Sequence, residues 1–293
     1  MLEGIPFGKF HFEAGVIMRN SLLVSRILFN CEAWYNITSA DMDLLETVDL
    51  MLLRGILKAP KSTPKEMLFL ELGLVPFREI IRQRRLGFLF YILNQSKESM
   101  IYKVFESQRR NSTPKDWVTT ILSDLNELNW DITIEDIQQM KKKRFLNIVK
   151  RKVQNKSFKD VLKIKEKHSK VKSIKHKMLQ MQNYLLPNKL NMKIEDSQLI
   201  FKLRCKVTET KINLKGMYDD HGCIACSKEN ESQEHILQCN EILQLNNEYE
   251  INEIPKYEKL QNGDVSDQLL ISKIFTSNMK VLEKLKNIKD QKG

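Results

Sequence analysis

Glycine, proline and long hydrophobic runs are scarce in this sequence. Its 293 residues include only 10 Gly and 7 Pro, so the residues that interrupt helices are rare and a mostly helical chain is expected. The longest apolar run, Leu86 to Leu93, has eight residues, well short of the roughly 18 that a membrane-spanning helix needs. The sequence therefore predicts an all-α fold, and we expect no membrane partner.

Cysteines are few, and an apolar leader is missing from the start of the sequence. Three of the five cysteines lie close together, and a cluster of thiolates needs a reducing compartment. Residues 1–20 include Glu3, His11 and Glu13, where a secretory signal peptide would carry an unbroken apolar stretch. We therefore expect an intracellular protein, either nuclear or part of a cytoplasmic ribonucleoprotein.

Acidic residues are outnumbered by basic ones. The sequence has 37 Asp and Glu against 48 Lys and Arg, a net charge of +11. Residues 141–177 alone carry 16 Lys or Arg against Asp160 and Glu166, a net charge of +14, so the rest of the chain sums to −3. A basic balance this concentrated predicts an acidic partner, and RNA or DNA is the expected one.

Within this basic segment, apolar residues such as Phe145, Val149 and Val153 recur at helical spacing. This rhythm predicts an amphipathic basic helix or helix pair. A Lys-rich solvated surface is the alternative, and an anionic membrane is disfavoured because the apolar face has no Trp anchor. The side chains that we expect to contact phosphates are Lys141, Lys142, Lys143, Arg144, Arg151 and Lys152.

Residues 222–240 read GCIACSKENESQEHILQCN and carry three cysteines and one histidine at the spacing of a small zinc site. Cys223 and Cys226 are separated by two residues, so one tight turn can present both thiolates to one ion. His235 and Cys239 follow at an i, i+4 spacing, which puts imidazole and thiolate on one face of a helix. The pattern predicts that these four residues bind Zn²⁺.

Two alternatives to this ligand set stay open. The cysteines could cluster by chance, or His221, two residues before Cys223, could replace His235 as a ligand. With four protein ligands the zinc is expected to be structural, because a catalytic zinc keeps one position open for water.

Threonine-led capping boxes predict where four helices begin. In a capping box the Thr side chain accepts a hydrogen bond from the N–H three residues later, and the acidic side chain of that later residue accepts from the N–H of the Thr. Two of them carry Pro at the first helical position. The boxes are Thr38–Asp41, Thr63–Glu66, Thr113–Asp116 and Thr133–Asp136. No fixed repeat period emerges, so we expect an irregular helical array with a small zinc hairpin near the C-terminus.

Two further segments have a marked pattern. Residues 13–30 are apolar almost all round a helix, which predicts burial. Residues 76–95 combine an apolar face with four arginines, for which a solvated surface and phosphate contact are equally open readings. These arginines are Arg78, Arg82, Arg84 and Arg85. Arg204 is also expected to face outward.

Several strings resemble one family. FNCEAWY at 29–35, the segment LLETVDLMLLRGILKAPKSTPKEMLFLELGLVPFREIIRQRRLGFLFYILN, and DWVTTILSDLNEL at 116–128 are similar to the region after the polymerase palm in non-LTR (LINE-type) retrotransposon reverse transcriptases. The resemblance continues through QLIFKLRCKVTETKINLKGMYDDHGCIAC and covers most of residues 10–240. It implies a thumb, a C-terminal linker and a zinc knuckle that engages template RNA or target DNA.

The resemblance also implies a division of the chain. Residues 1–112 correspond to a helical thumb-like region, 113–215 to a basic helical linker and 216–246 to the zinc knuckle, followed by an acidic linker and a C-terminal helix over 247–293. The order Cys223, Cys226, His235, Cys239 matches the family's knuckle, although its usual last gap is four residues and here it is three.

Polymerase chemistry needs carboxylates that hold two metal ions, and the family supplies them from a Tyr/Phe-x-Asp-Asp turn in the palm. Tyr218-Asp219-Asp220 lacks the spacer residue and has no strand-rich context. We therefore expect no enzymatic activity from this chain alone.

We expect a C-terminal reverse transcriptase fragment that grips RNA or an RNA–DNA duplex without the palm active site. Its partners would be RNA or DNA and, if expressed in frame, the palm and fingers of the polymerase. The alternative is a repurposed helical scaffold that binds proteins and is stapled by a structural zinc.

Overall fold

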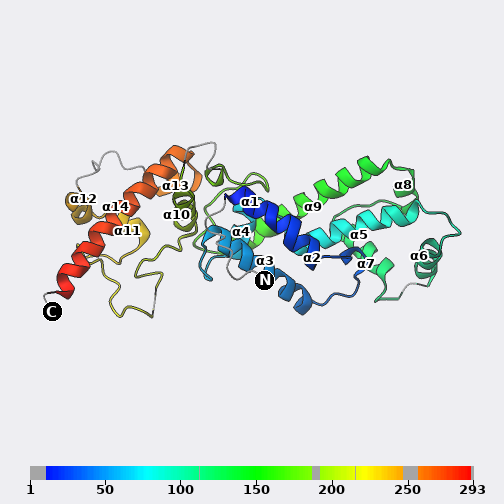
Figure 1. Cartoon of the computed structure of the whole chain (residues 1–293), viewed down its shortest axis with the longest axis horizontal. Helices are drawn as coiled ribbons and strands as arrows, with labels where there is room; N and C mark the ends of the chain where they lie inside the picture. The colour runs from blue at the N-terminus through cyan, green and yellow to red at the C-terminus, as the bar shows by residue number, and fades with distance from the viewer. Residues whose placement is uncertain (1–10, 112, 187–191, 215, 247–256, 292–293) are drawn as a thin grey trace.

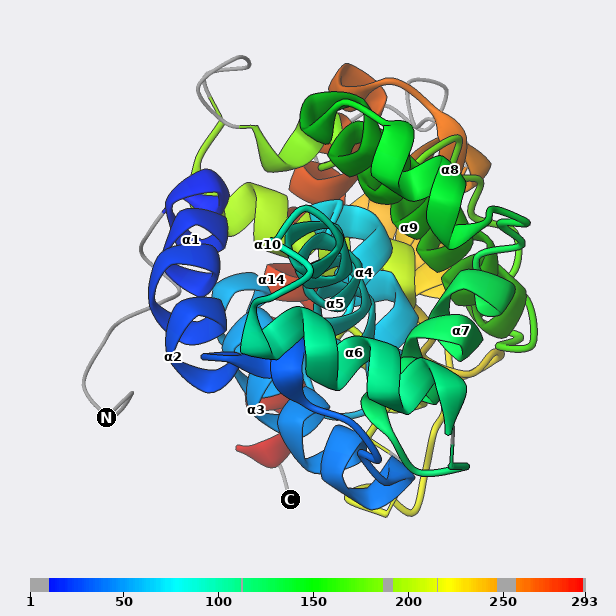
Figure 2. The same cartoon turned by 90° about the vertical axis from the view of Figure 1, so that its right-hand side faces the viewer.

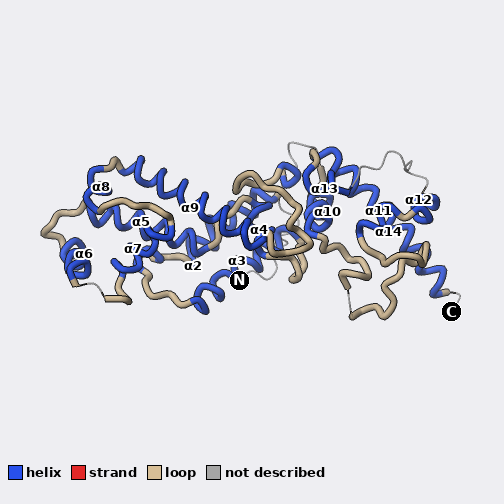
Figure 3. The backbone as a smooth tube through the Cα atoms, turned by 180° about the vertical axis from the view of Figure 1, so that it is seen from behind, coloured by secondary structure: helices blue, strands red, loops and turns tan. Residues whose placement is uncertain are grey.

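The structure, a computed structural model, describes residues 11–111, 113–186, 192–214, 216–246 and 257–291. Every named element in these ranges is helical, and pairing between extended segments there is limited to two isolated β-bridges. Figure 3 shows this alternation of helix and loop. The prediction of an all-α fold is confirmed.

The elements follow the order of the chain. They are α1 (Phe12–Met18), the π-helical segment η2 (Arg19–Val24), α2 (Ser25–Ile27), the 3₁₀ turn η3 (Cys31–Ala33), α3 (Ser39–Leu57), α4 (Lys65–Leu72), α5 (Phe77–Leu93), α6 (Met100–Arg110), α7 (Trp117–Glu127), α8 (Ile134–Gln139), α9 (Lys142–Lys165), the 3₁₀ turn η4 (Asn183–Leu185), α10 (Ile194–Cys205), α11 (Gln233–Gln238), α12 (Asn240–Leu245), α13 (Tyr257–Asn262) and α14 (Val265–Asp290).

The molecule is elongated, and its helices gather in three groups along the long axis (Figure 1). Helices α5 to α9 form one end, α1, α3 and α4 lie in the middle, and α10 to α14 form the other end. Seen from the first end, α5 lies centrally, with α6, α7 and α9 around it (Figure 2). Each group has an apolar core, and a fourth, smaller core joins η2, η3, α3 and α5.

Two of the four predicted capping boxes form as expected. The Thr38 side chain accepts from the N–H of Asp41, and Asp41 bonds back to the N–H of Thr38, at the start of α3. Thr133 and Asp136 do the same at the start of α8. These boxes depend on four consecutive residues only, which explains why the sequence predicts them.

The two boxes that contain proline are wrong. Thr63 is buried and makes no cap, and Pro64 itself takes the extended N-cap conformation before α4. At the second box, Asp116 is the N-cap of α7, and its carboxylate accepts from the N–H of Thr119. An Asp side chain caps a helix as well as a Thr side chain does. Because Asp116 rather than Thr113 is the cap, α7 begins three residues later than the box predicts.

The N-terminal helical segment is buried on one side only. Ile17 is 64% exposed and Leu22 is 49% exposed, so the expectation of all-round burial is wrong. The opposite side contains Arg19, whose guanidinium donates two hydrogen bonds of 2.6 Å to the buried Asp49 of α3. The segment is thus held by a buried ion pair as well as by apolar packing.

The middle core contains a buried charged group around Glu71 of α4. Its carboxylate accepts from Tyr184 at 2.6 Å and from Arg204 at 3.0 Å, and His176 lies 3.1 Å away. Arg204 also donates to the carbonyl oxygens of Leu260 and Gln261. The Glu71 cluster therefore ties α4 to α10 and α13, and the expectation that Arg204 faces outward is wrong.

Gly73 ends α4 where the backbone of residues 180–181 passes very close. It has a φ of +68°, and a Cβ here would lie 2.3 Å from the backbone of Gln180 and Met181. Glycine is required for both the left-handed turn and the close approach. Gly73 therefore fixes the position at which α4 ends.

The predicted four-part division stays a prediction. One core combines residues of α5 and α6 with residues of α7 and α9, and another combines the Cys/His segment with α13 and α14. In the described parts of the chain, no helix is both long enough and apolar enough to cross a membrane.

Candidate metal centre and basic face

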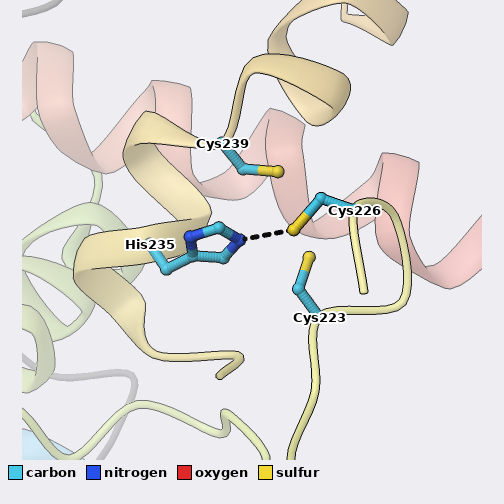
Figure 4. A group of neighbouring side chains, drawn as sticks. All are labelled: Cys223, Cys226, His235 and Cys239. Atoms are coloured by element: carbon cyan, nitrogen blue, oxygen red, sulfur yellow. Dashed lines mark hydrogen bonds between the residues drawn. The ribbon is translucent and has the colours of Figure 1, made fainter. Parts of the chain in front are cut away.

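Cys223, Cys226, His235 and Cys239 come together in one cluster. Their ligand atoms all lie within 4.8 Å of one another, and the side chains point toward a common centre (Figure 4). With metal–sulfur bonds of about 2.3 Å, the corners of a tetrahedral site lie roughly 3.7 Å apart. Three thiols and one imidazole at this spacing can hold a metal ion.

The first two ligands sit on a hairpin. Gly222 and Asn230 form a β-bridge, and the N–H of Cys223 donates to the carbonyl of Glu229 at 2.7 Å. Ser227 closes the turn with a φ of +55° and an N–H···O bond to Cys223 of 2.8 Å. This tight turn brings the Cys226 thiol back beside that of Cys223, as the two-residue spacing predicts.

The other two ligands do not share a helix, so that detail of the prediction is wrong. His235 lies within the short helix α11, whose N-cap Ser232 accepts from the N–H of His235. Cys239 follows the end of α11 with a ψ of 113° and starts the separate helix α12. The break in the helix at Cys239, rather than one helical face, aims the thiol at the site.

Polar groups around the cluster orient its ligands. Glu229 lies 3.1 Å from Nδ1 of His235, and Nε2 of the same ring faces the Cys226 sulfur at 3.3 Å. A carboxylate that accepts from Nδ1–H leaves Nε2 as the metal-binding nitrogen. The N–H of Lys228 also points at the Cys226 sulfur, 3.5 Å away.

The three thiols differ in acidity. Burial raises the pKa of Cys223, and it raises the pKa of Cys239 to about 12. Burial also acts to raise the pKa of Cys226, but hydrogen bonds from Lys228 and Glu229 N–H groups lower it to about 7. A bound dication deprotonates coordinating thiols, so metal binding here would release protons.

The cluster is packed against the C-terminal helix. Cys223 and Cys239 belong to the same core as Ile236, Ile274 and Phe275. The side-chain amide of Asn278 in α14 donates to the carbonyl of Ile236 at 2.8 Å, and α11 lies alongside α14 (Figure 1). An ion at this centre would fix the hairpin, α11 and α14 as one unit.

His221 and the Asp pair lie outside the cluster. Nδ1 of His221 is buried without a hydrogen-bond partner among the described residues, and His235 provides the imidazole of the cluster. Asp220 accepts from the N–H of Gly222 at 2.7 Å, and Tyr218 lies beneath the Lys286 ammonium. The four-residue cluster is the one group of three or more potential metal ligands in the part of the chain that the structure describes.

Residues 142–165 of the basic segment form a single helix, α9, and residues 166–177 lie in turns and loop after it. Phe145, Val149 and Val153 are fully buried, and Lys141 to Arg144 and Arg151 are exposed. At about 1.5 Å per residue its 24 residues span roughly 36 Å. The amphipathic basic helix is confirmed.

Four of the six predicted phosphate-binding residues share one surface groove. Its lining contains Lys141, Lys143, Arg144, Asn147, Ile148 and Arg151. Lys142 is exposed beside this groove. Lys152 instead makes contacts within the chain at the surface, because its ammonium donates to the carbonyl of Asn129 at 3.0 Å and lies over the Trp130 ring.

Three of the four arginines of α5 make internal contacts. Arg82 and Arg85 both bond the buried carboxylate of Asp124 in α7, at 3.1 and 2.7 Å, and Arg84 donates to the carbonyl of Leu28. No short-range pattern signals these pairs, since Asp124 is some 40 residues away from Arg82 and Arg85. Neither the solvated-surface reading nor the phosphate reading holds for these three.

Comparison with known proteins assigns no family to the chain. No family model matches its sequence, no curated protein matches it, and no solved structure matches its fold.

Proposed function

We propose that the chain grips RNA or an RNA–DNA duplex through the exposed basic face of α9. The groove lined by Lys141, Lys143, Arg144 and Arg151 carries this proposal. These side chains are exposed, and none of the described acidic residues forms an ion pair with them. Their charge is therefore available to phosphates.

The length of α9 also supports the proposal. A helix of roughly 36 Å is long enough to run past several successive phosphates of one strand. Its opposite face is anchored in a core with Phe90 and Trp130, so the basic side chains project from a fixed support. A rigid cationic ridge can neutralise several phosphates along one strand.

In this proposal the Cys/His cluster binds zinc, and the zinc is structural. Soft thiolates and an imidazole in a tetrahedral arrangement suit Zn²⁺, and four protein ligands leave no position for water. The ion would hold the hairpin of residues 222–230 against α11 and α14. The sequence resemblance adds that this hairpin is the zinc knuckle of a non-LTR reverse transcriptase, with the palm and fingers of that polymerase as a partner.

Salt dependence of RNA binding tests the phosphate contacts. We expect that replacing Lys141, Lys142, Lys143 and Arg144 by Ala weakens RNA binding and flattens its dependence on salt. Each lost phosphate contact lowers the log–log slope by roughly 0.7 to 0.9. The control is a variant with Ala at four exposed lysines away from α9: Lys97, Lys115, Lys280 and Lys284.

The outcome separates two functions. An unchanged slope in the α9 variant, or an equal change in the charge-matched control, would contradict the phosphate role. A wild-type chain that retains no RNA at low salt would instead favour the alternative, a protein-binding scaffold stapled by the metal.

Metal analysis tests the zinc site. We expect one zinc per purified chain, lost in Cys239→Ser, with unfolding of the C-terminal helices on chelation because structural zinc contributes folding energy directly. Cys31→Ala is the control, since Cys31 lies in a different core. Purified wild type without zinc would contradict this part of the proposal.

A further inference from the structure

A second surface hollow, lined by aromatic rings, lies beside the basic helix. It has a volume of about 500 Å³, and one wall is the face of α5 that carries Arg84, Gly87, Phe88 and Tyr91. The other wall is the segment after α2, with Phe29 and Glu32. A hollow of this size is in the range of small-ligand sites.

Two of its rings are exposed to solvent. Phe29 is 68% exposed and Tyr91 is 52% exposed, although large aromatic side chains are usually buried. Tyr91 is held parallel to Phe88, with ring centroids 5.9 Å apart, and Phe88 packs edge-on against the buried Trp117. The exposed Tyr91 ring therefore sits on a fixed aromatic support.

The hollow adjoins the basic helix. A Cβ on Gly87 would lie 3.6 Å from the Leu146 side chain of α9, so α9 passes along this edge of the hollow. Lys143 and Lys150 lie three residues before and four after Leu146, which places them on the same side of α9. Both are exposed, and no ion pair to either is formed within the described ranges.

Charge indicates which part of a nucleotide the hollow would take. The Glu32 carboxylate and the Arg84 guanidinium both line it, and Arg84 already donates to the carbonyl of Leu28. The two charges offset each other, so the hollow has no excess positive charge for a phosphate, and the carboxylate can accept from the exocyclic amino group of a base. Aromatic rings stack on the faces of unpaired bases, and the lysines next to the hollow can hold the adjoining phosphates.

We propose that this hollow is a stacking site for an unpaired nucleobase of a strand whose phosphates follow α9. The proposal rests on the proposed function and adds a single-stranded binding site to it. Phe29 and Tyr91 stack on the base, and Lys143 and Lys150 bind its flanking phosphates. Because every base has an aromatic face, the site accepts single strands of varied sequence.

The test compares the full chain on two probes by fluorescence anisotropy: a labelled single-stranded RNA and a strand of equal length without bases. We expect wild type to prefer the RNA. Phe29→Ala combined with Tyr91→Ala should weaken RNA binding roughly five- to hundredfold and leave binding of the baseless strand unchanged. The conservative pair Phe29→Tyr and Tyr91→Phe should retain wild-type affinity, as should the control Tyr35→Ala, an exposed aromatic outside the hollow.

Several results would overturn the proposal. Unchanged RNA binding by the double alanine variant would remove the stacking role, and so would an equal loss on both probes. Wild type could also dimerise as its concentration rises. If the double alanine variant lost this dimerisation but kept RNA binding, the hollow would be a contact site for a second copy of the chain instead. If wild type binds the two probes equally, the stacking site is contradicted and the proposed function is not. If wild type binds neither probe at low salt, the proposed function is contradicted as well.

Discussion

Two positively charged helices of this molecule, α5 and α9, use their charge in opposite ways. On α5, Arg82 and Arg85 are buried and share the carboxylate of Asp124. On α9, Lys143, Arg144 and their neighbours are exposed and line a groove. The two helices look alike as basic sequence, so charge density alone does not separate an internal ion-pair network from a binding surface. The distinguishing feature is a buried carboxylate on a neighbouring helix.

The largest expected effect is on stability, from removal of that carboxylate. Asp124→Ala leaves the buried guanidinium of Arg85 without a carboxylate partner, whereas Arg82 keeps Glu79 and Glu127. An uncompensated buried charge costs about 3 to 5 kcal/mol. We expect this loss in urea-induced unfolding. The control is Asp160→Ala, which removes an exposed partner of Lys156 and should cost less than about 1 kcal/mol. Similar losses in the two variants would break the distinction between α5 and α9.

The next effect concerns Arg204, which belongs with the α5 arginines because Glu71 holds it inside the molecule. Burial acts to raise the pKa of Glu71, but Arg204, His176 and Tyr184 together lower it to about 2 from 4.5. A folded-state pKa below the unfolded one contributes stability above about pH 4.5, and this is lost as the pH falls toward 2. The contribution is about 3 kcal/mol.

The measurement is urea unfolding of wild type and Glu71→Gln between pH 7 and pH 3. We expect the difference in unfolding free energy to shrink below about pH 4.5, where Glu71 in the unfolded chain becomes protonated. Glu98→Gln, at an exposed ion pair with Lys103, should show no such trend. A difference between wild type and Glu71→Gln that stays constant with pH would contradict the role of this ionised carboxylate.

The smallest effect comes from Lys152, which lies on α9 but has internal contacts. Because its ammonium bonds the Asn129 carbonyl and lies over Trp130, Lys152→Ala should cost about 0.5 to 1 kcal/mol of stability. It should weaken RNA binding less than Arg151→Ala, whose side chain lines the groove. Unfolding and RNA titration of both variants check this. A larger loss of RNA binding for Lys152→Ala than for Arg151→Ala would place the interface on the side of α9 that carries Lys152, which contradicts the proposal.

Short-range patterns explain how much of this could be predicted from the sequence. The capping boxes at Thr38 and Thr133, the Cys223–Cys226 turn and the apolar face of α9 each depend on residues within one or two helical turns. The sequence therefore predicts them correctly. The break between α11 and α12 at Cys239 was missed because it depends on how both helices pack against α14.

The long-range polar contacts could not be predicted. Asp124 meets Arg82 and Arg85 only because α7 packs against α5, and Glu71 meets Arg204 across 133 residues of sequence. The local sequence around a single acidic residue in an amphipathic helix is the same whether its side chain is solvated or buried. The exposed rings of Phe29 and Tyr91 were missed for a similar reason, since apolar residues in a helical pattern are usually assigned to the core.

Lysine protection by bound RNA tests most directly whether α9 meets nucleic acid. The full chain would be treated with an amine-specific acetylating reagent, with and without RNA, and the modified lysines identified by mass spectrometry. We expect RNA to protect Lys141, Lys142, Lys143 and Lys150 and to leave Lys97, Lys280 and Lys284 reactive. Protection of the second group with the α9 lysines still reactive would contradict the account.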